Sequence, residues 1–382
     1  MSALPNRTAE TCRQLMAAIG LPESTGNDLE LLVGGSQFVP AMLESIAGAQ
    51  RSILIEAFTL RRGTLALAFV NALAERATQG VDVRLVLDAV GSRFLPSRLL
   101  HQLRRSGVAV HFYGTLRWAD PRQYLVRNHR KTFTIDRSLS FIGGMSIDDV
   151  FIGSDSQRAW HEVMLRVRGP LAVQVAATFD ATYAELAGEP ACARYDDEET
   201  TLDGAGAVLL ASEPGVPYSR DAYIQLVRSA QRSIEITTPY FAPEATMLKE
   251  LVGAAERGVH IRLITAGAHT NARIVRAIAQ SYYPELLRVG VRIFEPAKRM
   301  THAKTILVDK IAWIVGSTNI DTRSFYVNLE ADILGCDSRV AADLSTIFAL
   351  LEAESDEISK AENARAIRRL FAGGVRFLTR YV

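Results

Sequence analysis

The chain has 382 residues, enough for two ordinary domains with sizeable hydrophobic cores. Hydrophobic residues make up 48% of the sequence and charged residues 22%, a composition that excludes a largely disordered chain. The formal net charge of +1, from 43 basic and 42 acidic residues, gives no bulk indication of nucleic acid binding.

Membrane and redox signals are also weak. No run of about 18 apolar residues is present, so we predict no membrane-spanning helix, and the N-terminus lacks the basic region and apolar core of a signal peptide. Cys12, Cys192 and Cys336 are odd in number and widely spaced, which argues against a disulfide framework and favours a reducing compartment. We therefore predict a cytoplasmic protein.

The first half of the chain alternates strand and helix patterns. After a short helix, a strand and a second helix, predicted over 8–19, 29–33 and 39–49, the sequence predicts β-rich segments at 51–58, 80–88 and 107–113. Helical spacing lies between them, at 65–76 and 96–105. Strands alternating with helices predict an α/β fold with a mixed, mostly parallel β-sheet flanked by helices.

The second half repeats this order, so the chain is a tandem duplication. The corresponding strands are predicted at 232–241, 258–265 and 290–296, with a helix beginning near Pro243. We divide the chain into domains at 1–190 and 207–358, a polar linker at 191–206 and a tail at 359–382. The tail is basic and amphipathic, so it either lies on an anionic bilayer or packs against the core.

One sequence motif occurs once in each half. His129, Lys131 and Asp136 have the spacing H-x-K-x-x-x-x-D, and His302, Lys304 and Asp309 repeat it 173 residues later without a gap. Side chains two apart in a strand share a face, so each histidine should point together with its lysine while the aspartate faces the other way. We expect the aspartates to support the fold.

The paired motifs resemble those of the phospholipase D superfamily, and the flanking sequence resembles the bacterial cardiolipin synthases. The matching tracts are NHRK and GGM around the first motif, then TPYF, SYYPELL and GSTNID, within a resemblance spanning about residues 32–336. It implies two tandem phospholipase D-like domains related by a pseudo-two-fold axis, with the active site at their seam. With both motifs in one chain, a monomer suffices.

The resemblance also implies a mechanism. A phosphodiester resists attack because its anionic oxygens repel nucleophiles and its alkoxide leaves poorly. Two lysines neutralise the phosphate, one histidine forms a covalent phosphohistidine and the other acts as acid and base. We assign His129 as the nucleophile and His302 as the acid/base, although the reverse assignment is equally open to the sequence. The catalytic set is His129, Lys131, Asp136, His302, Lys304 and Asp309.

Further residues complete the predicted site. Glu162 and Glu330 match acidic positions that orient the imidazoles, the alternative being ordinary strand-end glutamates. Phosphate binding is assigned to Asn319, to Ser146, which stands where related first motifs carry Asn, and to Ser317, whose place in the first copy is taken by Gly144. Asp148 and Asp321 are expected to hold turns. We predict no cofactor and no metal, because the remaining histidines show no ligand-like spacing: His101, His111, His161, His260 and His269.

A loop before the first motif is longer than its counterpart. Gly107 and His129 are 22 residues apart, whereas Gly290 and His302 are 12 apart. The extra loop is basic and aromatic and is either a site for lipid headgroups or a solvated loop; it contains Arg117, Trp118, Arg122, Tyr124, Arg127 and Arg130.

The expected function is that of a phosphatidyltransferase of cardiolipin synthase type, acting on phosphatidylglycerol or a similar donor. Many cardiolipin synthases begin with two membrane-spanning segments and this sequence departs from that pattern, so we expect peripheral contact with the inner face of the cell membrane. A hydrolytic phospholipase D is the first alternative. A nucleic acid phosphodiesterase is disfavoured by the near-zero net charge, and a non-enzymatic scaffold is disfavoured by two intact motifs.

Overall fold

The structure is a computed structural model that describes residues 16–116, 124–153, 159–189 and 204–359. In the first half, the helices and strands are β1 (Ser24–Val33), α2 (Gly35–Gly48), β2 (Ser52–Ala57), α3 (Thr64–Thr78), β3 (Asp82–Asp88), α4 (Ser97–Arg105), β4 (Ala109–Tyr113), β5 (Thr132–Ile135), β6 (Leu139–Gly143), η2 (Asp149–Phe151), β7 (Val163–Arg168) and α5 (Pro170–Ala187).

The second half repeats the arrangement. Its elements are β8 (Ala205–Ser212), α6 (Tyr218–Ser229), β9 (Ser233–Thr238), β10 (Phe241–Ala242), α7 (Ala245–Glu256), β11 (His260–Thr265), α8 (Arg273–Arg288), β12 (Arg292–Pro296), β13 (Thr305–Val308), β14 (Ala312–Gly316), β15 (Ile320–Asp321), α9 (Thr322–Tyr326), β16 (Glu330–Gly335), α10 (Ser338–Ala353) and β17 (Ser355–Glu357).

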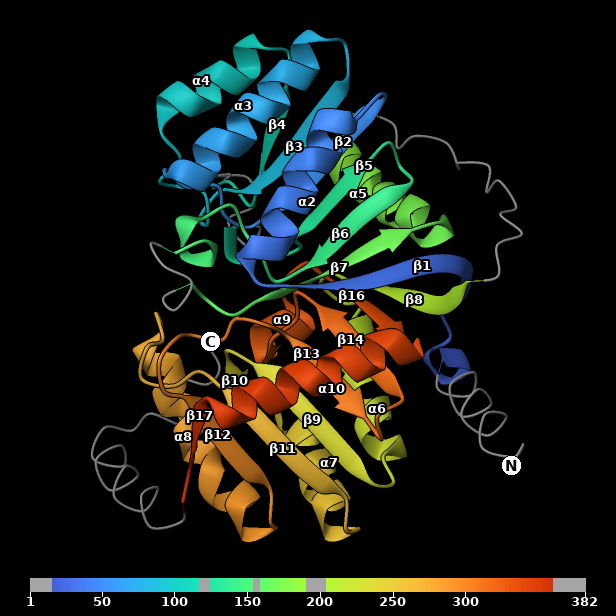
Figure 1. The fold of residues 1–382 in the computed structure, drawn as a ribbon, viewed down its shortest axis with the longest axis vertical. Coiled ribbons are helices and arrows are strands. Elements are labelled where there is room, and N and C mark those ends of the chain that lie inside the picture. The colour runs from blue at the N-terminus through green and yellow to red at the C-terminus, as the bar shows by residue number, and fades with distance from the viewer. Residues whose placement is uncertain (1–15, 117–123, 154–158, 190–203, 360–382) are drawn as a thin grey trace.

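A single large sheet runs through both halves. Its strand order is β17-β12-β11-β9-β13-β14-β16-β8-β1-β7-β6-β5-β2-β3-β4, so corresponding strands lie at equal distances from the central β8–β1 pair, apart from the terminal β17. Figure 1 shows the first half above and the second half below, with β1 and β8 between them. This order confirms the predicted duplication and brings the two motif strands, β5 and β13, toward the middle of the sheet.

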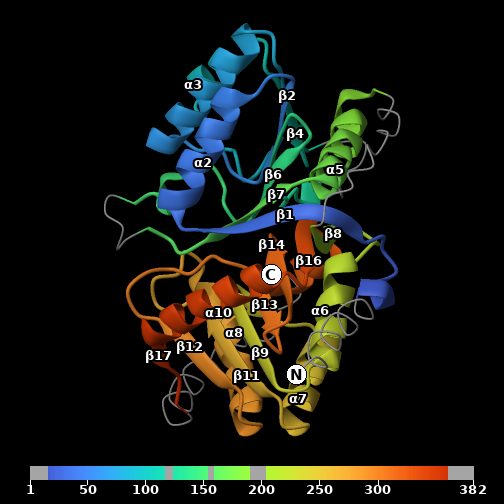
Figure 2. The same ribbon diagram turned by 45° about the vertical axis from the view of Figure 1, so that its right-hand side comes forward.

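Helices cover both faces of the sheet in each half. In the first half α2 and α3 pack on one face and α5 on the other, where Leu54 and Val86 contact Phe179 and Tyr183. Figure 2 shows the same arrangement, with α3 and α5 on opposite sides of the upper strands and α10 and α7 on opposite sides of the lower ones. This explains why β2 is buried along its whole length and carries three apolar residues in succession, Ile53 to Ile55, rather than an alternating pattern.

The α/β architecture is confirmed, but the sheet is not mostly parallel as expected. Parallel pairs within it occur among β2, β3 and β4 and among β9, β11 and β12, while the neighbours between those groups are antiparallel. The reason is local: β5 and β6, like β13 and β14, are joined by turns of three residues, and so short a turn connects only antiparallel strands. Within the described part of this large sheet, parallel pairing occurs only between strands joined by crossover helices, and the separate β10–β15 pair is also parallel.

The motif aspartates hold these turns. Asp309 has a φ of 54° and its carboxylate accepts hydrogen bonds from the backbone N–H groups of Gln231, Arg232 and Ser233, at 2.7 to 2.9 Å. Asp136, with a φ of 49°, does the same at the start of β2. Both carboxylates therefore lie at the opposite end of the motif strand from the histidine, which agrees with a structural role and separates them from the catalytic set.

Replacing Asp309 by alanine is expected to lower the free energy of unfolding by about 2–4 kcal/mol, because it removes three hydrogen bonds to a carboxylate and leaves alanine in a left-handed conformation. Denaturant unfolding measures this loss, with Asp309→Asn as a milder control. Turnover per folded molecule should stay within about tenfold of the original, since a group outside the site makes no transition-state contact. A thousandfold loss in a folded variant would return Asp309 to the chemistry.

Several expectations concern residues outside the description. The linker and the tail lie almost wholly there, as do Arg117, Trp118 and Arg122, so the domain boundaries stay a prediction. Cys336 is disulfide-bonded, which corrects the expectation from cysteine spacing, and the cytoplasmic location loses that support. Of the helices that the structure describes, none combines the length and apolar composition needed to cross a bilayer.

Candidate active site

The two motifs meet through backbone contacts that cross between the halves. The His129 N–H donates to the carbonyl of Leu329 at 2.9 Å, and the His302 N–H donates to the carbonyl of His161 at 2.7 Å. Each histidine therefore lies beside a segment of the opposite half, and the next residue of that segment is a glutamate.

The histidines and glutamates pair across the seam. His129 Nδ1 lies 2.9 Å from both carboxylate oxygens of Glu330, and His302 Nδ1 lies 2.7 Å from Oε2 of Glu162. Both glutamates are fully buried. Neither half by itself contains a complete histidine–glutamate pair, a result that distance along the chain did not indicate.

The two glutamates are held differently. The Ser317 hydroxyl donates to Glu330 at 2.5 Å and accepts the Ala331 N–H at 3.0 Å, so it supports the glutamate and differs from the phosphate contact expected of it. In the first half, a Cβ at Gly144 would lie 2.1 Å from Oε2 of Glu162. Glycine at this position leaves room for the carboxylate that orients His302.

Both motif lysines are buried beside their histidines. Lys131 Nζ donates to the carbonyl of His129 at 2.5 Å, and Lys304 Nζ donates to the carbonyl of His302 and lies 3.7 Å from Glu162. Burial lowers the pKa of Lys131 to about 7, aided by Lys304 and opposed by Glu330. Burial likewise lowers the pKa of Lys304 to about 8, against the nearby Glu162 and Glu330.

These groups form one electrostatic cluster. Burial, Lys131 and Lys304 hold the pKa of His129 well below its usual range, and burial and Lys304 lower the pKa of His302 to about 3. The free protein therefore carries neutral imidazoles at pH 7. Because each lysine acts on the histidine of the other half as well as its own, the two motifs share one locus.

The two glutamates differ in the direction of their pKa shifts. Burial opposes ionisation of Glu162, but Lys304 and His302 outweigh it and the pKa of Glu162 falls below its usual value. Burial raises the pKa of Glu330 to about 7, even with Lys131 nearby. Glu162, the partner of His302, is therefore ionised at neutral pH, whereas Glu330, the partner of His129, titrates near neutrality.

The remaining polar candidates come after β6 and β14, the strands that pair with the motif strands. Ser146 and Asn319 are buried, and Oδ1 of Asn319 has no hydrogen-bond partner among the described residues. Asp148 accepts the Val150 N–H, and Asp321 accepts the Ser324 N–H at 2.7 Å, as expected of turn residues. Phosphate binding by Ser146 and Asn319 stays a prediction.

Aromatic rings surround the histidines, and sequence reasoning missed them. The ring centroid of Phe58 lies 5.1 Å from that of His129, and the rings of Trp160, Phe151 and Tyr240 lie 5.4, 5.7 and 6.4 Å from that of His302. Of these rings, only those of Phe58 and Tyr240 lie in predicted strands, at the ends of 51–58 and 232–241. These rings limit the access of water to the imidazoles.

Two arginines of the long loop do not face solvent. Arg127 is buried near Asp88, 3.5 Å away, and Arg130 is buried with its guanidinium on the carbonyls of Glu330 and Ser212. Arg130 therefore helps to hold the seam together and Arg127 lies against Asp88 of the first half, which corrects the suggestion that they bind lipid headgroups. Among the described residues no three histidine, cysteine, aspartate or glutamate side chains gather as metal ligands do.

Comparisons with known proteins point in one direction. The sequence matches the family described as "Cardiolipin synthase, PLD-like domain" over residues 42–184 and 223–351. It is 32% identical to cardiolipin synthase A of Pseudomonas aeruginosa strain LESB58, over 93% of this chain and 73% of that protein. It is 31% identical to cardiolipin synthase A of Pseudomonas fluorescens strain SBW25, over 98% of this chain and 78% of that protein.

Solved structures share the fold at low sequence identity. The crystal structure of phosphatidylserine synthase from Haemophilus influenzae Rd KW20 superposes with a TM-score of 0.75 at 12% identity, covering 97% of this chain and 99% of that chain. Polyphosphate kinase from Porphyromonas gingivalis gives a TM-score of 0.61 at 14% identity, covering 92% of this chain and 53% of that chain.

Proposed function

Since this chain belongs to the cardiolipin synthase family with PLD-like domains and is a phosphatidyltransferase of phospholipase D type, we propose that it transfers the phosphatidyl group of phosphatidylglycerol to the free hydroxyl of a second lipid or of a polyol. The observation that carries this proposal is the crossed pairing of two buried histidine–glutamate pairs around two buried lysines. Such a constellation suits a displacement at a phosphodiester without a metal.

The first step forms a covalent intermediate. With Nδ1 held by Glu330, Nε2 of His129 attacks phosphorus, and the bond from phosphorus to the glycerol oxygen breaks. The bound anionic phosphate offsets the lysines and raises the pKa of His302, so that its Nε2 binds a proton from solvent when the substrate binds. The protonated His302 then gives this proton to the glycerol oxygen, so glycerol leaves neutral. Lys131 and Lys304 offset the charge on the phosphoryl oxygens, where a fixed cation is worth more than in water.

The second step reverses the first with a new alcohol. The acceptor hydroxyl loses its proton to Nε2 of His302, its oxygen attacks phosphorus, and the bond to His129 breaks. In the free protein the pKa of His302 is too low for this basic role. The bound anionic phosphate offsets the lysines and raises that pKa, so the ring can hold the proton it takes. Phosphatidylglycerol as acceptor yields cardiolipin.

Transfer rather than hydrolysis depends on excluding water from the intermediate. The aromatic rings around His302 support transfer. Oδ1 of Asn319, an acceptor without a partner among the described residues, supports a ligand hydroxyl in the same place, and we infer that Asn319 Nδ2 and the Ser146 hydroxyl donate to the phosphate. Because both motifs and both glutamates come from one chain, we also infer that a monomer is active at the inner face of the cell membrane.

Purified protein with vesicles of phosphatidylglycerol is expected to produce cardiolipin and free glycerol in equal amounts, identified by mass. Added glycerol should then regenerate phosphatidylglycerol, because the phosphohistidine accepts either alcohol. Phosphatidic acid as the sole product would replace transfer by hydrolysis. Cleavage of an oligonucleotide with no change in the lipids would replace the lipid substrate altogether.

A further inference from the structure

Large apolar side chains are exposed in loops of both halves. Among the described residues, Phe94 before α4 is 58% exposed, Leu125 before the first motif is 60% exposed, and Ile274 at the start of α8 is 62% exposed. Exposed apolar residues are ordinary when they are scattered, so their positions relative to the site decide whether they matter.

Phe94 adjoins the turn that follows the first motif. The guanidinium carbons of Arg93 and Arg61 lie 4.6 and 5.9 Å from the centre of its ring. Arg61 also pairs with Asp148 at 3.5 Å, and its backbone N–H donates to the carbonyl of Ile147. Phe94 therefore contacts Arg61, which in turn contacts the turn that carries Ser146.

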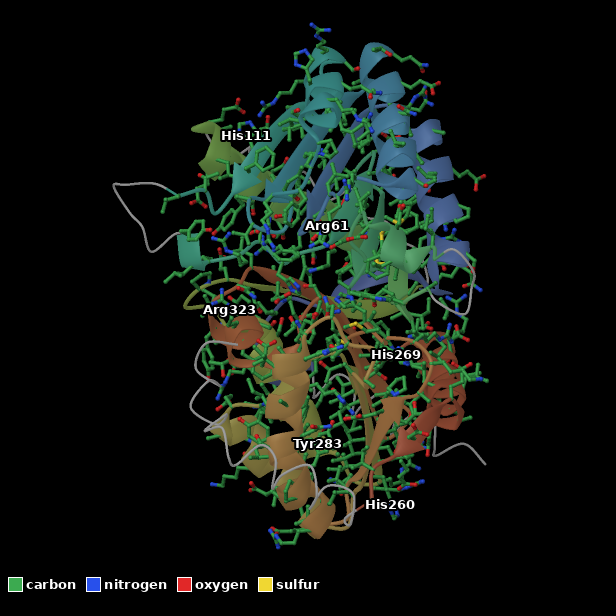
Figure 3. The ribbon with its side chains drawn as sticks, turned by 90° about the vertical axis from the view of Figure 1, so that its left-hand side faces the viewer. Arg61, His111, His260, His269, Tyr283 and Arg323 are labelled. Atoms are coloured by element: carbon green, nitrogen blue, oxygen red, sulfur yellow. The ribbon has the colours of Figure 1, made fainter. Side chains whose placement is uncertain are left out.

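Leu125 and Ile274 lie on segments that lead to the two histidines. Leu125 is four residues before His129, and its carbonyl accepts a hydrogen bond of 2.7 Å from Arg323 of the second half. Ile274 is three residues after Asn271, which accepts the Tyr240 hydroxyl at 2.8 Å, and Tyr240 contacts the ring of His302. Figure 3 shows Arg61 and Arg323 on one face, from opposite halves and on either side of the seam.

The same loops are strongly basic. Nine arginines, of which Arg127 and Arg130 are buried, and no acidic residue occur in the five segments that carry or adjoin these side chains, in a chain whose net charge is only +1: 58–64, 89–98, 124–130, 266–276 and 322–326. Arg62, Arg93, Arg98 and Arg273 are exposed. Of the carboxylates that approach from neighbouring elements, Asp88, Asp148 and Glu295 each lie against an arginine, and Asp149 accepts the backbone N–H groups of Thr64 and Leu65.

We propose that this docking rim, formed by Phe94, Leu125 and Ile274 with Arg62, Arg93 and Arg273, seats the protein on an anionic phospholipid bilayer with the catalytic seam facing the lipid. Apolar tips that insert and arginines that meet headgroup charge are the two ordinary components of peripheral membrane binding. The inference rests on the proposed transferase function, because a lipid substrate must pass from the bilayer to the histidines.

The first test removes the apolar tips. Phe94→Ser/Leu125→Ser/Ile274→Ser is expected to lower the partition coefficient onto vesicles of phosphatidylglycerol and phosphatidylcholine by at least about tenfold, measured by sedimentation. The matched control is Leu350→Ser, since Leu350 is 63% exposed on α10, outside the rim. Equal binding of the triple variant and the control would overturn the proposal.

The second test removes the charge. Arg62→Glu/Arg93→Glu/Arg273→Glu is expected to abolish the preference for these vesicles over pure phosphatidylcholine, and it serves also if the serine variant does not fold. An unchanged preference counts against the rim. So does a loss confined to the binding of a single-stranded oligonucleotide, which would assign these arginines to nucleic acid.

Vesicle binding and catalysis can be measured separately. His129→Ala should bind vesicles as the original protein does, because docking needs no turnover. The triple serine variant should turn over a short-chain phosphatidylglycerol below its critical micelle concentration within about twofold of the original rate, since its changes lie outside the catalytic groups. Vesicle binding without any turnover by the original protein would reject the transferase and leave the rim standing.

Discussion

Replacing either His129 or His302 by alanine is expected to reduce the conversion of phosphatidylglycerol to cardiolipin by at least about four orders of magnitude, because one change removes the nucleophile and the other the proton donor. His111→Ala and His260→Ala are the matched controls. Figure 3 shows both of these histidines away from the seam, one in each half, so their replacement should leave turnover within about twofold. Full activity in His129→Ala and His302→Ala would leave only a lipid-binding scaffold.

Trapping assigns the two roles. A phosphodiester with a nitrophenol leaving group needs no acid, so His302→Ala should accumulate a phosphoprotein in which phosphorus is bound to His129. His129→Ala should accumulate none. The opposite outcome, with phosphorus on His302, would exchange the nucleophile and the acid/base while keeping the same site.

Replacing Lys131 or Lys304 by methionine is expected to lower kcat/KM by about two to three orders of magnitude, the usual effect of removing one charged donor from a transition state in a water-poor site. Neither lysine is exposed to solvent, and methionine fills a similar length without the charge. Lys298→Met is the control, since Lys298 is exposed four residues before the second motif. An effect no larger than that of the control would remove the lysines from phosphate binding.

The same lysines set the alkaline side of the pH profile. With the pKa of Lys131 lowered to about 7 and that of Lys304 to about 8, both ammonium groups lose their protons as the pH rises, so kcat/KM should fall between about pH 7 and pH 9. A bound phosphate anion raises both pKa values, so the fall in kcat should appear at higher pH. Coincident limbs in kcat and kcat/KM would show that the titrating group does not contact the phosphate.

The repeated sequence carried most of the fold and the identity of the central site residues. His129, Lys131, His302 and Lys304 were recognisable because each half repeats the same chemistry at the same spacing, and a duplicated motif is a local property of the chain. The strands and helices before each motif were also predictable, because their apolar spacing is local. The direction of strand pairing was not, since three-residue turns rather than composition determined it.

Three features were decided by tertiary structure alone. Position along the chain does not indicate that Glu330 bonds His129 or that Glu162 bonds His302, because both contacts form between the two halves of the folded protein. Ser317 and Arg130 changed roles because the folded protein placed hydrogen-bonding partners beside them.

The chain by itself therefore determined which residues we propose to attack, protonate and neutralise a phosphodiester, since side-chain type and spacing follow from the order of residues along it. Only the folded protein decided which carboxylate lies beside which imidazole, how burial moves their pKa values, and which loops form the proposed docking rim. Those properties depend on the distances between residues of different halves, and a pattern read along one dimension does not contain them.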